Sequence, residues 1–163
     1  MDMQWNKTRK LTYSAMIMAI YVVIMYFTQG FAFGQYQIRI ATALYAMAYL
    51  FPFLVIPMGL SNLIANFLFG GLGVLDMVGG TIVGIVTTSL IVLIRKRGWS
   101  RKWIAVPIVL IPGLGVSIYL SYLLHIPYVP LAESLCIGQV IPSICGVILV
   151  QVLKKTGKVG VMV

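Results

Sequence analysis

Long hydrophobic runs follow one another along the chain, and within them apolar residues do not alternate with polar ones. This pattern is typical of membrane-spanning helices and not of half-buried strands. The runs cover residues 11–28, 40–75, 76–94, 103–124 and 131–153. One span needs about 20 residues, so we divide the uncharged stretch 40–75 near Pro52 and Pro57, which interrupt it. The pattern predicts an all-α integral membrane protein with six transmembrane helices.

Basic residues lie in three clusters that flank these runs. Six helices place both termini on one side of the membrane, together with the connection between the fourth and fifth helices. All three clusters then share that side, which the excess of Lys and Arg in cytoplasmic loops identifies as the cytoplasm. Five helices would separate the first cluster from the other two, so we favour six. The clusters are Lys7, Arg9 and Lys10; Arg95, Lys96, Arg97, Arg101 and Lys102; and Lys154, Lys155 and Lys158.

The amino-acid composition agrees with a membrane protein and excludes several other classes. Hydrophobic residues make up 61% of the 163 residues and charged residues 9%, whereas soluble domains carry about 25% charged residues. A soluble enzyme, a secreted disulfide scaffold and a disordered chain are therefore excluded. We expect residues 1–163 to form one membrane domain. The net charge of +9 follows the topology, so no nucleic-acid partner is expected.

Motifs of catalysis are missing from the sequence. There is no nucleophile with a base and an orienting group, no HExxH metal motif and no P-loop lysine. We therefore expect neither enzyme activity nor a cofactor or metal. If the chain takes part in active transport, the energy must come from another subunit.

Polar residues of the predicted helices gather at the end opposite the basic clusters. Arg39 opens the second helix, Asp76 opens the fourth, and Glu133 lies in the first turn of the sixth. Asn66 in the third helix and His125 after the fifth belong to the same level. Ionisable groups at membrane depth are costly and usually line a cavity or a pathway. The alternative is solvation among headgroups, with one structural pair between Arg39 and a carboxylate.

The third predicted helix carries a stripe of small and amide residues on one face. Gly59, Asn62, Asn66 and Gly70 are spaced to share that face. Such a stripe serves close helix packing, with amides bonding across the interface, or it faces a ligand. Asn66 fits both interpretations equally, and Asn62 favours packing.

The connection between the first two helices is rich in aromatic and amide side chains. Residues 29–38 include Phe33, Tyr36 and Gln37 among several glycines, aromatics and glutamines. Such a segment suits a lid whose rings stack on a planar polar ligand. An aromatic belt at the membrane interface is the alternative for any single ring. Gln139 in the sixth helix lies near Pro142, which frees a backbone carbonyl, and it is a further candidate.

Three segments and one residue pair carry a resemblance to a known family. Residues 36–44 read YQIRIATAL, residues 65–68 read ANFL, and residues 73–80 read GVLDMVGG. Ala15 and Ala19 form an Ala-x-x-x-Ala pair in the first of six helices. With the basic N-terminus, these features resemble the QueT family of substrate-binding S components of energy-coupling factor (ECF) transporters. The resemblance is strongest over residues 11–95.

The resemblance implies a multi-pass protein of the bacterial plasma membrane that takes up a queuosine precursor, such as queuine or another 7-deazaguanine. It implies docking through Ala15 and Ala19 onto a membrane scaffold subunit that is driven by two ATPase subunits. Arg39, Asn66 and Asp76 match the family pattern by position. Where the family tends to carry glutamates, this chain has Ala41, Thr42 and Ala43 just after Arg39, and Gln139 in the sixth helix; Glu133 or Asp76 would supply the carboxylate. The rival hypothesis is a small self-sufficient transporter or channel.

Overall fold

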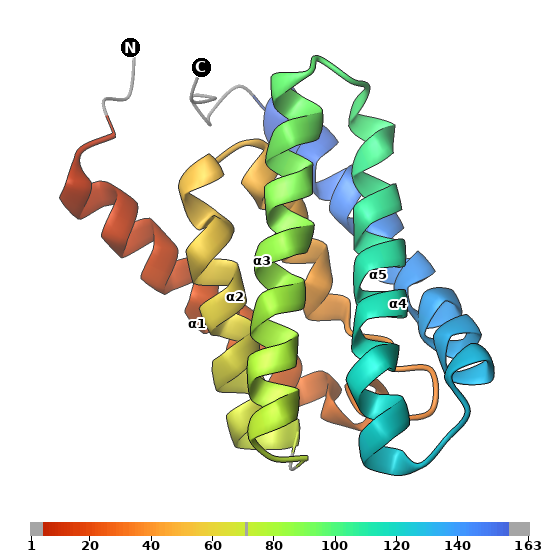
Figure 1. The fold of residues 1–163 in the computed structure, drawn as a ribbon. Helices are drawn as coiled ribbons and strands as arrows, with labels where there is room; N and C mark the ends of the chain where they lie inside the picture. The colour runs from red at the N-terminus through yellow and green to blue at the C-terminus, as the bar shows by residue number, and fades with distance from the viewer. Residues whose placement is uncertain (1–4, 71, 157–163) are drawn as a thin grey trace.

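The computed structural model describes residues 5–70 and 72–156, and these residues form helices and short connections without any strand. Five α-helices make the bundle in Figure 1, and four short helices of other types interrupt or extend them. The α-helices are α1 (Lys7–Ala32), α2 (Val55–Ala65), α3 (Val74–Lys96), α4 (Ala105–Leu124) and α5 (Tyr128–Lys155). The short helices are η1 (Ile40–Tyr49), η2 (Pro52–Leu54), η3 (Asn66–Gly70) and η4 (Arg101–Ile104).

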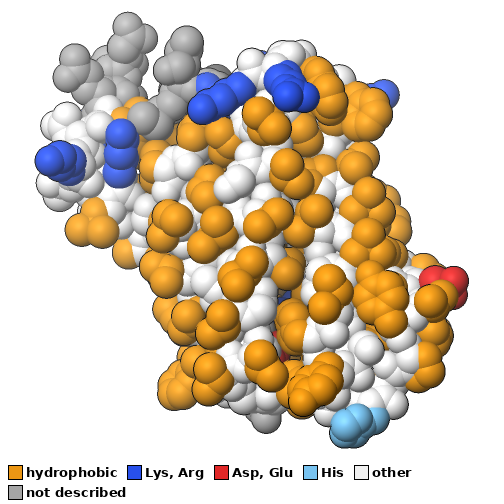
Figure 2. Space-filling view, viewed as in Figure 1, with side chains coloured by type: hydrophobic (Ala, Val, Ile, Leu, Met, Phe, Trp, Pro, Cys, Tyr) orange, Lys and Arg blue, Asp and Glu red, His pale blue; other side chains and the backbone are white. Residues whose placement is uncertain are grey.

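Five helical segments of the described chain are long and apolar enough to cross a membrane. They are Lys7–Ala32, Pro52–Gly70, Val74–Lys96, Arg101–Leu124 and Tyr128–Lys155. Their outer surfaces carry hydrophobic side chains over most of the height of the bundle (Figure 2). An apolar belt of this kind is stable against lipid, because exposing so much apolar surface to water is unfavourable. These segments confirm the membrane-protein class and the all-α fold.

The second of the six predicted helices differs from the expectation. It is present as η1, a 3₁₀ helix of ten residues, which is shorter than a membrane span. Eight consecutive residues of η1, 41–48, are buried, and η1 contacts each of the five α-helices. The α-helices therefore surround η1 and shield it from lipid. Small residues such as Ala41, Ala43 and Ala46 allow this close approach.

The described ends of the chain and the connection from α3 to α4 lie at the same end of the bundle (Figure 1). Lysine and arginine side chains gather there, as Figure 2 shows. Arg95 donates to the Tyr49 and Leu50 carbonyls at 3.1 and 3.2 Å, so the end of η1 is bonded to this basic end. We call this end of the bundle, where the lysines and arginines gather, the basic end. Lys158 lies outside the described residues.

Two glycines set how closely α2 and α3 pack. A Cβ on Gly84 would lie 3.2 Å from the Gly59 Cα, so the two backbones almost touch. The predicted stripe on the third helix therefore faces α3. Another difference concerns α1, which continues to Ala32, so that the connection to η1 is shorter than the expected 29–38.

Candidate ligand-binding site

Arg39 lies at the end of the bundle opposite the basic end, where the chain enters η1. Its side chain is buried, with 4% of its surface exposed. The guanidinium donates to the Oδ1 atoms of Asn62 and Asn66 at 3.0 and 3.1 Å, and to the Ala32 carbonyl at 3.4 Å. Its carbon atom lies 4.8 Å from the centre of the Phe33 ring, which is within range of a cation–π contact. Amide oxygens and one ring thus hold a buried positive charge.

The two asparagines also bind α3, so they fix Arg39 between helices. Asn62 Nδ2 donates to the Gly80 carbonyl at 2.8 Å and to the Tyr45 hydroxyl at 3.1 Å. Asn66 Nδ2 donates to the Asp76 carbonyl at 2.9 Å and to Asp76 Oδ1 at 3.2 Å. Asn66 therefore links the arginine to the carboxylate. In an apolar interior, such a network is stable because its amides are satisfied on both sides.

Asp76 in the first turn of α3 keeps one carboxylate oxygen free of any hydrogen bond within the described residues. The residue is 1% exposed, and its Oδ2 atom is buried without a partner, as is the Tyr119 hydroxyl. A Cβ on Gly70 would lie 2.7 Å from this oxygen and 3.4 Å from the Phe33 ring. A buried acceptor without a donor is costly, and the Tyr119 hydroxyl lies close enough to Asp76 to interact with it, so a ligand donor at Oδ2 would compete with this hydroxyl.

Gln139 of α5 joins a second set of polar groups to the first. It accepts from Thr42 Oγ1 at 3.0 Å and donates to the Gln37 carbonyl at 3.0 Å. The Arg39 carbonyl is a second acceptor close to Thr42 Oγ1, and the single hydroxyl proton serves one acceptor at a time. Gln37 has a φ of 42°, a left-handed conformation that is unfavourable for a residue with a side chain. The bond to Gln139 thus stabilises a strained residue two positions before Arg39.

Unusual helix types position these side chains. In a 3₁₀ helix, residues three apart lie above one another, so Arg39, Thr42 and Tyr45 line up along η1 and its first flanking residue. The π-helix η3 begins at Asn66. Short π-helical stretches often occur at functional sites. The backbone therefore departs from regular α-helix at η1, which follows Arg39, and at η3, which begins at Asn66.

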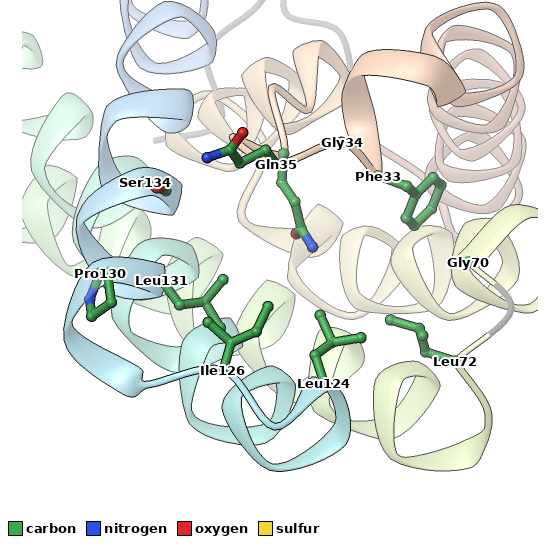
Figure 3. Close-up of a pocket in the computed structure, with 11 residues that line it drawn as sticks. Phe33, Gly34, Gln35, Gly70, Leu72, Leu124, Ile126, Pro130, Leu131 and Ser134 are labelled. Atoms are coloured by element: carbon green, nitrogen blue, oxygen red, sulfur yellow. The ribbon is translucent and has the colours of Figure 1, made fainter.

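A cavity of about 390 Å³ opens beside this cluster. Phe33, Gly34, Gln35 and Gln37 line it from the connection before η1. Gly70, Leu72, Leu124, Ile126, Pro130, Leu131 and Ser134 complete the lining. Figure 3 shows Phe33 and Ser134 on opposite sides and the leucines and Ile126 facing the connection. The volume is within the range of small-molecule sites, and the mostly apolar wall with a few polar groups is typical of them.

A void of about 10 Å³ lies among the buried polar residues themselves. Its lining includes Arg39, Thr42, Tyr45, Asn62 and Gln139, and Gln37 lines both this void and the larger cavity. A void of this size holds at most one water molecule. Gln37 therefore separates the open cavity from the arginine.

The structure brings most of the predicted site residues together but not all of them. Arg39, Asn66, Asp76, Gln37 and Gln139 belong to one hydrogen-bonded cluster, and Phe33 stacks on it. The Tyr36 side chain is 47% exposed and lines neither cavity.

Glu133 lies apart from this cluster. It is exposed and lines neither the cavity nor the void, whereas its neighbour Ser134 lines the cavity. His125 is also exposed, at the end of α4. The carboxylate nearest to Arg39 in the network is therefore that of Asp76.

Three residues of the cluster were not anticipated as site residues: Thr42, Tyr45 and Gly80. Thr42 and Tyr45 follow Arg39 at intervals of three, which is a signal only for a 3₁₀ helix. Gly80 leaves room for the amides, because a Cβ there would lie 2.6 Å from Asn66 Nδ2 and 3.2 Å from Asn62 Nδ2. Asn62, for which the sequence favours a packing role, binds Arg39 directly.

Comparison with known proteins agrees with this architecture. The family described as QueT transporter matches residues 11–155, which include every residue of the cluster. No curated protein and no solved structure matches the chain. A transporter is expected to have several apolar helices around a polar site, and this chain has both. It is a multi-pass membrane protein and belongs to the QueT transporter family.

Proposed function

We propose that the chain is the substrate-binding S component of an ECF-type importer, and that it captures a queuosine precursor, queuine or another 7-deazaguanine, outside the cell. The observation that carries the proposal is the buried cluster of Arg39, Asn66 and Asp76 beside a cavity at the end opposite the basic residues. Charged groups at membrane depth are costly and are retained mainly where they serve a ligand or a pathway.

The chemistry of the cluster suits the edge and the face of a deazaguanine. Such a base presents ring N–H and amino donors, which a carboxylate accepts, and the free Oδ2 of Asp76 supplies one. It also presents a carbonyl oxygen, to which a side-chain amide lining the cavity donates, or Arg39 if Gln37 moves aside. Its flat face stacks on an aromatic ring, and the Phe33 ring lines the cavity. Neither Asp76 nor Glu133 lines the cavity, but Asp76 is buried in the network that holds Arg39, whereas Glu133 is exposed.

The distribution of charge supports an outward-facing cavity. The described lysines and arginines other than Arg39 belong to the basic end, and the cavity lies at the opposite end. The positive-inside rule makes the basic end cytoplasmic. In this orientation the chain crosses the membrane six times, with η1 as the short, shielded second crossing.

The first helix offers a surface for the scaffold subunit. Ala15 and Ala19 are exposed on α1, whereas Ile17 and Tyr21 are buried in the bundle. Two small residues one turn apart allow another helix to approach closely. We infer that the scaffold with its two ATPase subunits docks here.

Calorimetry on the purified chain tests the ligand, with queuine as the probe and adenine as the control base. We expect saturable binding of queuine at one site and much weaker binding of adenine, which lacks the carbonyl oxygen. Co-expression with an ECF scaffold and its ATPases tests the partners, since the tagged chain should retain them. Queuine binding without retention of the scaffold would support the self-sufficient transporter. Retention of the scaffold without queuine binding would show that queuine is not the ligand.

A further inference from the structure

A second hollow lies on the outer surface of the bundle at its basic end, between α3 and α4. Its volume is about 350 Å³. The α3 side is lined by Leu90, Leu93, Ile94 and Arg97, and the α4 side by Trp103, Val106, Pro107, Leu110 and Ile111, with Trp99 from the connection above them. None of these residues belongs to the cluster around Arg39.

The lining changes in character along the helix axis. Leu90, Leu93, Ile94 and Arg97 follow one face of α3 over seven residues, which is a rise of about 10 Å. The deeper part of the hollow is wholly aliphatic. Its upper rim carries the Arg97 guanidinium, 5.9 Å from the Trp99 ring, and the Trp99 and Trp103 rings lie 5.6 Å apart. This order of groups, a cation and indoles above alkyl side chains, matches a phosphate headgroup above an acyl chain.

Arg97 is free to meet such a headgroup, whereas its neighbour Arg95 is engaged. Arg95 donates to the Tyr49 and Leu50 carbonyls. Arg97 is exposed and lines the hollow. The described acidic residues, Asp76 and Glu133, occur early in α3 and α5, at the other end. Positive charge at the rim of the hollow is therefore not neutralised by a carboxylate of the described chain.

We propose that this hollow binds one anionic glycerophospholipid of the cytoplasmic leaflet, with an acyl chain between α3 and α4 and the phosphate against Arg97 and the indole N–H groups. The proposal rests on the membrane orientation given above but not on the identity of the transported ligand. A juxtamembrane basic residue contributes about 1 kcal/mol of attraction to an anionic surface, which corresponds to about a fivefold change in affinity.

Quenching of tryptophan fluorescence by brominated lipids tests the proposal. Changing Trp5 to Phe leaves Trp99 and Trp103 as reporters, and the protein is reconstituted in phosphatidylcholine vesicles. We expect a small share of brominated phosphatidylglycerol to quench these residues at about fivefold lower concentration than brominated phosphatidylcholine. Arg97→Gln should remove this preference, and Arg97→Lys should restore most of it. Lys154→Gln removes the same charge from another part of the basic end and should leave the preference unchanged.

Other outcomes would overturn the proposal. Equal quenching by both lipids would show that the hollow holds bulk lipid without selection. An equal loss of preference in Lys154→Gln would show a general effect of surface charge. Release of the lipid by millimolar inorganic phosphate would show a site for small anions, and protection from both lipids by a bound scaffold subunit would show a protein interface.

Discussion

Substituting alanine for Gly80 tests whether the amides that hold Arg39 are packed against α3 as described. The added methyl group would lie 2.6 Å from Asn66 Nδ2 and 3.2 Å from Asn62 Nδ2. Both nitrogens donate to α3 carbonyls at 2.8–2.9 Å, so they cannot retreat without breaking those bonds. Their Oδ1 atoms accept from Arg39, so a shift of either amide also weakens the contact with the guanidinium.

Opposing contributions decide the sign of the effect. Alanine gains about 1 kcal/mol over glycine in a helix interior. Overpacking a filled site costs about 1–3 kcal/mol, and loss of one hydrogen bond to a charged group costs about 1.5–3 kcal/mol. The balance is a loss of about 1.5–5 kcal/mol. For a chain of this size, each kcal/mol lowers the melting temperature by roughly 2–4 °C.

Thermal unfolding in detergent, with and without queuine, measures both consequences. We expect Gly80→Ala to melt lower and to lose the stabilisation that bound ligand gives the native chain. Gly30→Ala is the matched control, because its Cβ would meet nothing within 4 Å and the residue lies in α1. That variant should melt at the same temperature or slightly higher. A Gly80→Ala protein as stable as the native one, with its ligand response intact, would refute the packing described for this cluster.

Three further predictions concern the ligand, the partner and the orientation. Asp76→Asn keeps the shape of the side chain but should weaken queuine binding at least about 30-fold, since a lost buried charged contact costs about 2–5 kcal/mol. Glu133→Gln, the control, should bind queuine normally. Unchanged affinity of Asp76→Asn in calorimetry would exclude Asp76 from the site. Changing Ala15 and Ala19 together to Trp should abolish uptake and scaffold retention but not queuine binding; a parallel loss of binding would mean that this face maintains the fold. A cysteine placed at Gly98 in a cysteine-free background should react with an impermeant maleimide only in opened cells, and labelling of intact cells would contradict the proposed orientation.

Hydrophobic runs and the positions of charges were sufficient to predict much of this fold. The five long helices occur within a few residues of the predicted runs, because lipid-facing length and apolarity are direct properties of the sequence. The same alternation of helices assigned Arg39, Asn66 and Asp76 to one level, and they form one network. Depth along a helix can be deduced from where the helix begins.

Rotation about the helix axis could not be deduced in the same way. Glu133 was assigned to the same level, yet it faces outward, because nothing in its own helix says which side meets the bundle. For η1, the expected α-helical period turns each residue by about 100°, which places Tyr45 about 120° away from Arg39. The 3₁₀ period aligns them. η1 is buried among five surrounding helices, and a local α-helical pattern in the sequence does not reveal this arrangement.

If the cluster at Arg39 is the ligand site, the shortness of η1 sets the depth at which the ligand is held. Ten residues of 3₁₀ helix span about 20 Å, whereas the hydrocarbon core is about 30 Å thick. Arg95 bonds the far end of η1 to the basic end of the bundle. In the proposed orientation, Arg39 therefore lies about 10 Å below the outer boundary of the hydrocarbon. Under the proposed function, a molecule bound there would already lie in the outer third of the bilayer, and the remaining two thirds would be left for the energy-consuming step.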